Sequence, residues 1–221
     1  MTANGVTRPL DLATSGRLLP APPAAGRYHV IYADPPWRFD TYSDKGKGRS
    51  AEAHYDCLSL NDIKALPVAD WAAGDAVLLL WVTDPLLPRG LDVMAAWGFT
   101  YKTIAFVWAK LNRRADPDHL RPGDFFRGLG YWTRANPELC LLGTRGQPKR
   151  VARDVDRLVI APRREHSRKP EEIYQRIERL VDGPYLELFA RQQRERWHAW
   201  GAQAGLFDHG PVETRRRPSV G

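Results

Sequence analysis

The chain has 221 residues, enough for one domain with a substantial core and too few for two full domains. Its 33 lysines and arginines outnumber its 26 acidic residues, and the net charge of +7 is compatible with a polyanionic partner. No apolar run approaches the roughly 20 residues of a membrane span, and the two cysteines exclude a disulfide framework. With no signal-peptide pattern at the start, we expect a cytoplasmic protein that binds no membrane.

The ends of the chain differ in composition from its centre. Residues 1–26 lack periodicity and contain PAPPAAG (20–26), so we expect a flexible lead-in. Residues 206–221 end in ETRRRPSVG and are expected to form a flexible basic tail. The region between them, 27–205, is predicted to be a single domain.

Within this domain, apolar runs of strand length alternate with helical patterns. The predicted strands are 27–33, 75–83, 99–110, 137–146, 157–162 and 185–190. The predicted helices are 59–73, interrupted or ended near Pro67, then 85–98, ended by Gly98, and 169–181. A stretch rich in Arg, Asp, Pro and Gly, 111–131, is expected to be a loop. Buried strands separated by helices indicate an α/β fold with a mostly parallel sheet and helices on both faces.

The first predicted strand ends in an unusual turn, VIYADPPW (30–37). Its two prolines fix φ and lack N–H groups, so the turn presents carbonyl acceptors beside the carboxylate of Asp34. Trp37 offers an aromatic face on which a base can stack. Together these groups suit a flat heterocycle with an exocyclic amine, which a duplex would have to flip out. The alternative is a simple strand cap with Trp37 in the core.

This turn resembles the motif of the MT-A70 family of S-adenosylmethionine-dependent N6-adenine methyltransferases. Further blocks resemble the family in the family's order: HYDCLSLNDIKALPV (54–68), LLLWVT (78–83), AWGFTYKTIAFVWAK (96–110), NPELCLLGTRGQP (136–148), SRKPEEIYQRIERL (167–180) and YLELFAR (185–191). The likeness covers about residues 27–203 and is nearest to the bacterial and phage branch. It implies a Rossmann-like methyltransferase sheet with a circularly permuted motif order, because DPPW comes first and ELFAR last.

The resemblance also implies a catalytic site. Asp34 and the carbonyl oxygen of Pro35 are expected to accept the hydrogens of the adenine amine. Pro36 completes the motif, and Trp37 is expected to pack against the base. No metal is implied, because the sulfonium methyl group of the cofactor is already activated and catalysis requires positioning.

The implied cofactor is S-adenosyl-L-methionine. By similarity, its pocket would include Asp34, with Lys169 near the methionine carboxylate, Glu187 and Arg191 along the walls, and Gln203 at the cofactor adenine. For Lys169 the alternative is a solvated lysine at a helix start. For Glu187, an acid in a buried strand that needs a partner, the alternative is an internal arginine.

Two loops are candidates for contact with the substrate. Residues 38–56 are expected to close over the pocket, with His54 or Tyr55 approaching it. In the 111–131 loop, Arg113 and Arg114 occur with further arginines and aromatics, a combination that suits a nucleic-acid backbone and its bases. The alternatives are an ordinary flexible loop, and arginines that are merely solvated.

These features predict methyl transfer to the N6 amine of adenine in DNA. The same chemistry on RNA is one alternative, because both polymers present the same base. A catalytically silent nucleic-acid-binding subunit is another, although such a subunit is expected to lose the acid or the aromatic residue of the motif. A homodimer or a heterodimer is compatible with the sequence.

Overall fold

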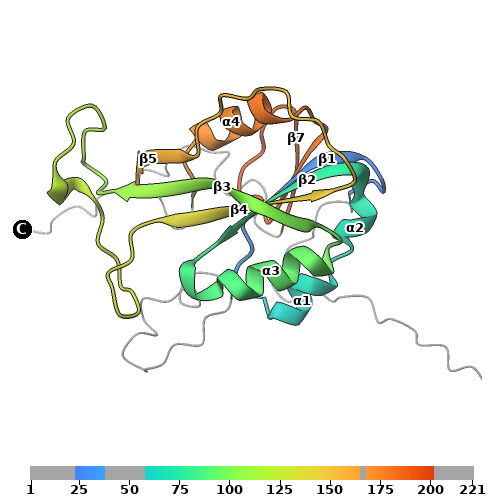
Figure 1. The fold of residues 1–221 in the computed structure, drawn as a ribbon, viewed down its shortest axis with the longest axis horizontal. Helices are drawn as coiled ribbons and strands as arrows, with labels where there is room; N and C mark the ends of the chain where they lie inside the picture. The colour runs from blue at the N-terminus through green and yellow to red at the C-terminus, as the bar shows by residue number, and fades with distance from the viewer. Residues whose placement is uncertain (1–22, 38–57, 165–167, 202–221) are drawn as a thin grey trace, which may run out of the picture.

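A seven-stranded mixed sheet forms the centre of the fold, which we describe from a computed structural model (Figure 1). The structure describes residues 23–37, 58–164 and 168–201. Most of the predicted lead-in and the whole predicted tail lie outside these ranges.

The strands follow the order β5-β3-β4-β2-β1-β6-β7 across the sheet. Their bounds are β1 (Tyr28–Ala33), β2 (Ala72–Val82), β3 (Thr100–Leu111), β4 (Glu138–Arg145), β5 (Leu158–Pro162), β6 (Tyr185–Leu188) and β7 (Trp197–Trp200). Strand β4 is antiparallel to β2 and β3, whereas all other neighbouring strands are parallel. The expected mostly parallel α/β sheet is therefore confirmed.

The predicted helices are present with altered bounds. They are α1 (Leu60–Ala65), α2 (Val68–Trp71), α3 (Leu87–Ala96) and α4 (Glu172–Leu180), with short 3-10 turns η3 (Asp84–Leu86) and η4 (Pro122–Asp124). The pattern over 59–73 divides at Pro67 as expected, but Ala72 and Ala73 already belong to β2. Helix α4 begins three residues after Lys169, which therefore lies in the segment before it. No described helix has the length and apolar character needed to cross a membrane.

The two faces of the sheet are covered by different helices (Figure 1). Helices α1 and α3 pack on one face, where Leu78 and Leu80 of β2 point. Helix α4 packs on the other face, toward Leu79 and Trp81. Because both faces of β2 are buried, its sequence is a continuous apolar run and does not alternate with polar residues.

The carboxyl ends of the parallel strands bring distant residues together at one edge of the sheet. Strands β1 and β6 are neighbours, with Ala33 opposite Leu188, so Asp34 lies beside the residues that follow β6. Strand β4 runs the other way, and its first residue, Glu138, faces Trp108 near the end of β3. The antiparallel strand thus places a carboxylate at the same edge.

Candidate active site

Asp34 is the first residue after β1, and its carboxylate forms an ion pair with Lys169. The Nζ atom of Lys169 lies 2.6 Å from Oδ2 of Asp34. The lysine side chain is 5 % exposed, whereas that of Asp34 is 24 % exposed. The cation is therefore sealed inside the protein and holds a carboxylate that still reaches the surface of the site.

This ion pair is the end of a chain of alternating charges. Glu138 accepts from Lys169 at 3.2 Å and from Lys110 at 2.5 Å. Burial alone would lower the pKa of Lys169, but the carboxylates of Asp34 and Glu138 outweigh it and raise that pKa. Burial would likewise raise the pKa of Glu138, but the two lysines lower it. Glu138 and Lys169 are therefore both held in their charged forms.

Hydrogen bonds within the protein hold the DPPW turn in one conformation. The carbonyl oxygen of Pro35 accepts the backbone N–H of Trp37 at 2.8 Å, and that of Pro36 accepts the N–H of Leu58 at 3.1 Å. A carbonyl oxygen has two lone pairs, so Pro35 retains capacity for a second donor. The turn can therefore present an acceptor next to Asp34 without rearrangement.

Trp37 lies in the hydrophobic core. It packs with the α1 and α3 cluster, and its indole N–H donates to the carbonyl oxygen of Trp81 at 3.1 Å. Trp81 in turn donates to the hydroxyl of Tyr32 at 2.8 Å, and Nζ of Lys169 lies 5.2 Å from its ring centroid. This core position matches the alternative weighed for Trp37, and its contact with a base stays a prediction.

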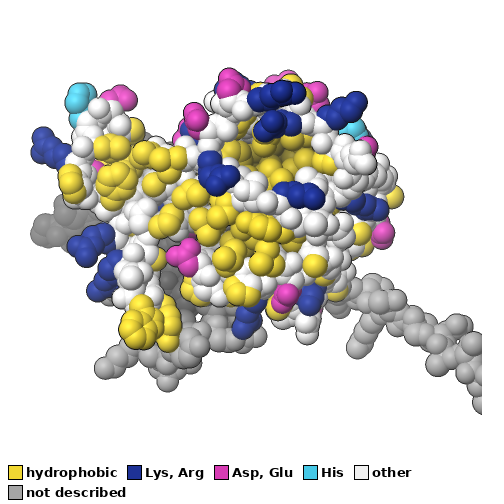
Figure 2. Space-filling model, in the orientation of Figure 1, with side chains coloured by type: hydrophobic (Ala, Val, Ile, Leu, Met, Phe, Trp, Pro, Cys, Tyr) yellow, Lys and Arg dark blue, Asp and Glu magenta, His cyan; other side chains and the backbone are white. Residues whose placement is uncertain are grey.

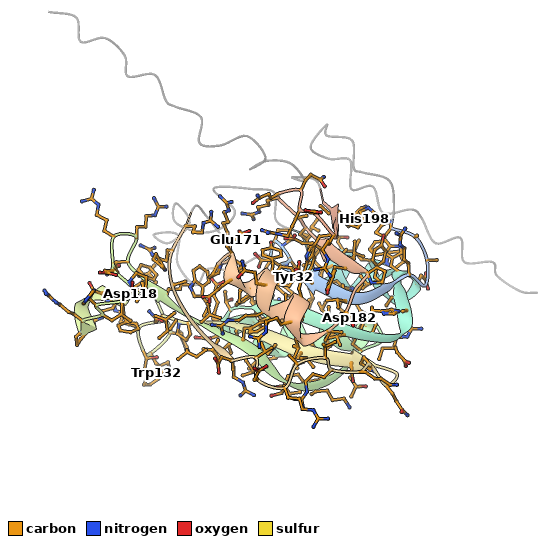
Figure 3. The ribbon with its side chains drawn as sticks, turned by 90° about the horizontal axis from the view of Figure 1, so that it is seen from above. Tyr32, Asp118, Trp132, Glu171, Asp182 and His198 are labelled. Carbon is orange, nitrogen blue, oxygen red and sulfur yellow. The ribbon has the colours of Figure 1, made fainter. Side chains whose placement is uncertain are left out.

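A pocket opens beside Asp34, between the ends of β1 and β6 and the segment before α4. Figure 3 marks Tyr32 and Glu171, two residues of its lining. Four predicted site residues from distant parts of the chain also line it, namely Asp34, Lys169, Glu187 and Arg191. The structure therefore brings these four together, and their roles toward a cofactor stay predictions.

Glu187 of β6 is the second acid of this pocket. The hydroxyl of Tyr174 donates to its Oε1 at 2.8 Å. Burial raises the pKa of Glu187 to about 7, although the Tyr174 hydrogen bond and the charge of Arg194 oppose this rise. The guanidinium of Arg194 lies 3.8 Å from the Tyr174 ring centroid. The partner found for Glu187 is thus a tyrosine, with an arginine nearby.

Of the four residues predicted to contact the substrate, the structure describes two, Arg113 and Arg114. Arg113 and Arg114 lie exposed in the loop after β3, and Arg113 donates to the carbonyl oxygen of Arg164 at 3.3 Å. Their contact with nucleic acid stays a prediction. His54, Tyr55 and Gln203 fall outside the described residues.

Sequence reasoning missed three residues of this site: Lys110, Glu138 and Tyr174. Glu138 opens the apolar run ELCLL, so the argument applied to Glu187, that an acid in a buried strand needs a partner, would also have identified it. Lys110 lies near the end of the apolar strand β3, and its ammonium group pairs with Glu138. Tyr174 carries no comparable signal, because a tyrosine on a helix is ordinarily core.

Known proteins resemble this chain over most of its length. The sequence profile of the MT-A70 family matches residues 28–203. The Type II methyltransferase M.MunI of a Mycoplasma species is 30 % identical over 195 residues, covering 80 % of this chain and 78 % of that protein.

Eukaryotic proteins match the same region as part of longer chains. The N(6)-adenosine-methyltransferase MT-A70-like protein of Arabidopsis thaliana is 31 % identical over 80 % of this chain and 24 % of its own length. The human N(6)-adenosine-methyltransferase catalytic subunit METTL3 is 31 % identical over 75 % of this chain and 26 % of its own length. The present chain thus spans about a quarter of these eukaryotic relatives. From the profile match and the bacterial relative together, the chain belongs to the MT-A70 family of methyltransferases.

Proposed function

We propose that the protein transfers a methyl group from S-adenosyl-L-methionine to the N6 amine of adenine in DNA. The observation that carries this proposal is the carboxylate of Asp34, held by the buried Lys169 at 2.6 Å beside the rigid Pro35 carbonyl. Two fixed acceptors at the open end of a parallel strand suit the two hydrogens of one exocyclic amine.

The pocket residues fit the proposed cofactor. Among the described residues, Glu187 receives a hydrogen bond only at Oε1, so its other oxygen suits a ribose hydroxyl. Arg168 and Arg191 line the same pocket and suit the methionine carboxylate, whereas the buried Lys169 is paired with Asp34 and Glu138. When bound, the cofactor supplies a methyl group activated by its sulfonium charge.

The residues of the chain then act by positioning. Asp34 accepts one N–H of the amine and Pro35 accepts the other, which directs the nitrogen lone pair toward the methyl group. Lys169 holds the carboxylate of Asp34 in place, and Glu138, which also pairs with Lys110, holds Lys169. The amine becomes acidic once it is methylated, so Asp34 is placed to receive the proton after attack.

We prefer DNA to RNA because the chain matches most of the length of a bacterial Type II methyltransferase and only part of the eukaryotic relatives. The chain covers 78 % of the bacterial Type II methyltransferase but about a quarter of the proteins named N(6)-adenosine-methyltransferase. RNA is the second candidate, because those eukaryotic names specify adenosine. A silent subunit is disfavoured, since the motif keeps both Asp34 and Trp37.

The test is methyl transfer from labelled S-adenosylmethionine to duplex and single-stranded DNA and RNA. The products are digested and N6-methyladenine is identified by mass spectrometry, with Asp34→Asn as the inactive control. Labelled N6-methyladenine in DNA supports the proposal, and labelling of RNA alone replaces DNA by RNA. Absence of transfer to all four polymers, with cofactor binding intact, contradicts it.

Cofactor affinity is expected to depend on pH through Glu187. Ribose hydroxyls donate to the ionised carboxylate, and the pKa of about 7 means that this form dominates only above neutrality. We therefore expect affinity to rise with pH up to about 7, by roughly tenfold per unit in the acid range. Calorimetric titrations of wild type and Glu187→Gln test this, because the variant should show weaker binding without the pH dependence. An equal slope in both proteins contradicts it.

Without cofactor, the contribution of Glu187 to the stability of the protein should fall as the pH rises, opposite to its effect on cofactor affinity. A raised folded-state pKa means that the neutral form of Glu187 is favoured by folding. Its contribution is complete below the ordinary value of 4.5 and is lost as the pH rises through about 7. Urea unfolding of wild type and Glu187→Gln over this range measures the difference.

A further inference from the structure

The loop between β3 and β4 carries an exposed apolar tip formed by Leu129, Tyr131 and Trp132. These side chains are 66 %, 75 % and 94 % exposed. Figure 3 shows Trp132 at the end of a projecting loop, away from the body of the protein. In Figure 2, hydrophobic side chains gather at the end of this loop, with Lys or Arg side chains close by. So large an aromatic group exposed to water indicates a binding function.

The backbone of the tip is built to present this side chain. Trp132 has φ of 70°, a left-handed conformation that bulky residues rarely adopt. The turn is closed by Thr133, whose N–H donates to the carbonyl oxygen of Tyr131 at 2.9 Å. A Cβ atom at Gly130 would lie 1.9 Å from the Thr133 carbonyl oxygen, so only glycine fits there. Such strain persists where the surrounding structure imposes it, as at ligand-binding sites.

The base of the loop that carries the tip is linked to the charge network beside Asp34. Asn136, just after the tip, binds the backbone of Lys110 twice, accepting its N–H at 3.1 Å and donating to its carbonyl oxygen at 2.9 Å. The side chain of Lys110 continues through Glu138 and Lys169 to Asp34. The loop that carries the tip is therefore connected, through Asn136 and Lys110, to the residues that hold Asp34.

The charges around the tip favour a nucleic acid over a protein. Residues 112–136 contain five arginines and three aspartates, and Arg127 and Arg134 flank the tip with exposed side chains. Two of the aspartates already have partners within the loop, since Asp116 contacts His119 and Asp124 accepts from the backbone of Arg121. A second copy of this basic chain would meet repulsion here, whereas phosphates would be attracted.

We propose that Trp132 stacks on a base next to the target adenine, replacing the adenine in the base stack while the adenine occupies the pocket beside Asp34. Apolar side chains placed between bases hold stacks open in this way, and flipped bases leave such a gap. The substrate is then a polynucleotide with neighbouring bases and not a free nucleoside. This inference rests on the proposed function, since it assumes that an adenine enters the pocket.

The test compares binding of two oligonucleotides, one with normal neighbours and one with abasic positions on both sides of the adenine. Stacking predicts that Trp132→Ala weakens binding of the normal oligonucleotide by about tenfold. The abasic oligonucleotide should bind wild type and variant equally. Trp132→Phe should keep most of the affinity, and Tyr101→Ala, which removes another exposed aromatic at the start of β3, should leave it unchanged.

Three results would overturn this role. Trp132→Ala could have no effect, or weaken both oligonucleotides equally, which would remove the dependence on neighbouring bases. Alternatively, the variant could change the sedimentation of the protein without changing binding, which would make the tip a protein interface. Binding is measured independently of methyl transfer, so the two proposals can fail separately. If wild type transfers no methyl group but Trp132→Ala weakens binding of the normal oligonucleotide alone, the proposed activity is contradicted and stacking is supported.

Discussion

Replacing Asp34 with asparagine is expected to lower the rate of methyl transfer to adenine by about 1,000-fold, the middle of the range for positioned acid–base groups. The amide keeps the size of the side chain but offers one acceptor oxygen and a competing N–H₂ group. It also removes one of the two carboxylates that hold Lys169. Single-turnover rates with saturating cofactor measure the effect without a contribution from product release.

Two measurements separate this effect from misfolding. Asp34→Asn should keep a melting temperature near that of wild type. Its cofactor affinity should change by far less than the roughly 1,000-fold expected for its rate. Asp92→Asn is the matched control, because Asp92 is an exposed acid on α3, and its rate should equal that of wild type. If Asp34→Asn kept a rate within a few fold of wild type, another group would have to orient the amine.

Replacing Lys169 with methionine is expected to have the largest effect on stability, a loss of about 3–5 kcal/mol in the free energy of unfolding. The ammonium group of Lys169 is shared by Asp34 and Glu138. Methionine offers neither carboxylate a partner, and a buried charge without a partner is costly. Urea unfolding followed by fluorescence measures the change. Lys102→Met is the matched control on the exposed start of β3 and should change stability by less than about 0.5 kcal/mol.

The double variant Lys169→Met with Glu138→Gln tests the cause. Removing the charge of Glu138 together with its cation should recover part of the lost stability, because one buried carboxylate no longer needs a partner. If the double variant is as unstable as the sum of the two single changes, the loss comes from packing and not from charge.

The stabilisation by this network should also have a defined pH window. The lowered pKa of Glu138 contributes stability that is present above the ordinary value of 4.5 and is lost as the pH falls through the folded-state pKa below it. The raised pKa of Lys169 contributes below the ordinary value of 10.5 and is lost as the pH rises through the folded-state pKa above it. The difference between wild type and Lys169→Met should therefore be greatest between about pH 5 and pH 10.

Local patterns were sufficient for much of this protein. The apolar run of β2 and the break at Pro67 predicted strand and helices because burial and backbone geometry act over a few neighbouring residues. The DPPW turn likewise marked the end of β1, because prolines fix the local backbone geometry. β7 was missed, because WHAW is only four residues long and follows a polar stretch.

The charge network depended on contacts that no local pattern contains. Lys169 and Asp34 are separated by 135 positions, and they meet because the segment before α4 lies beside the end of β1, which is the neighbour of β6. Glu138 joins them only because β4 runs antiparallel between β2 and β3, which brings its first residue to the edge where the other strands end. The order and direction of strands depend on the packing of the whole sheet, and for that reason the contacts that hold Asp34 became visible only in three dimensions.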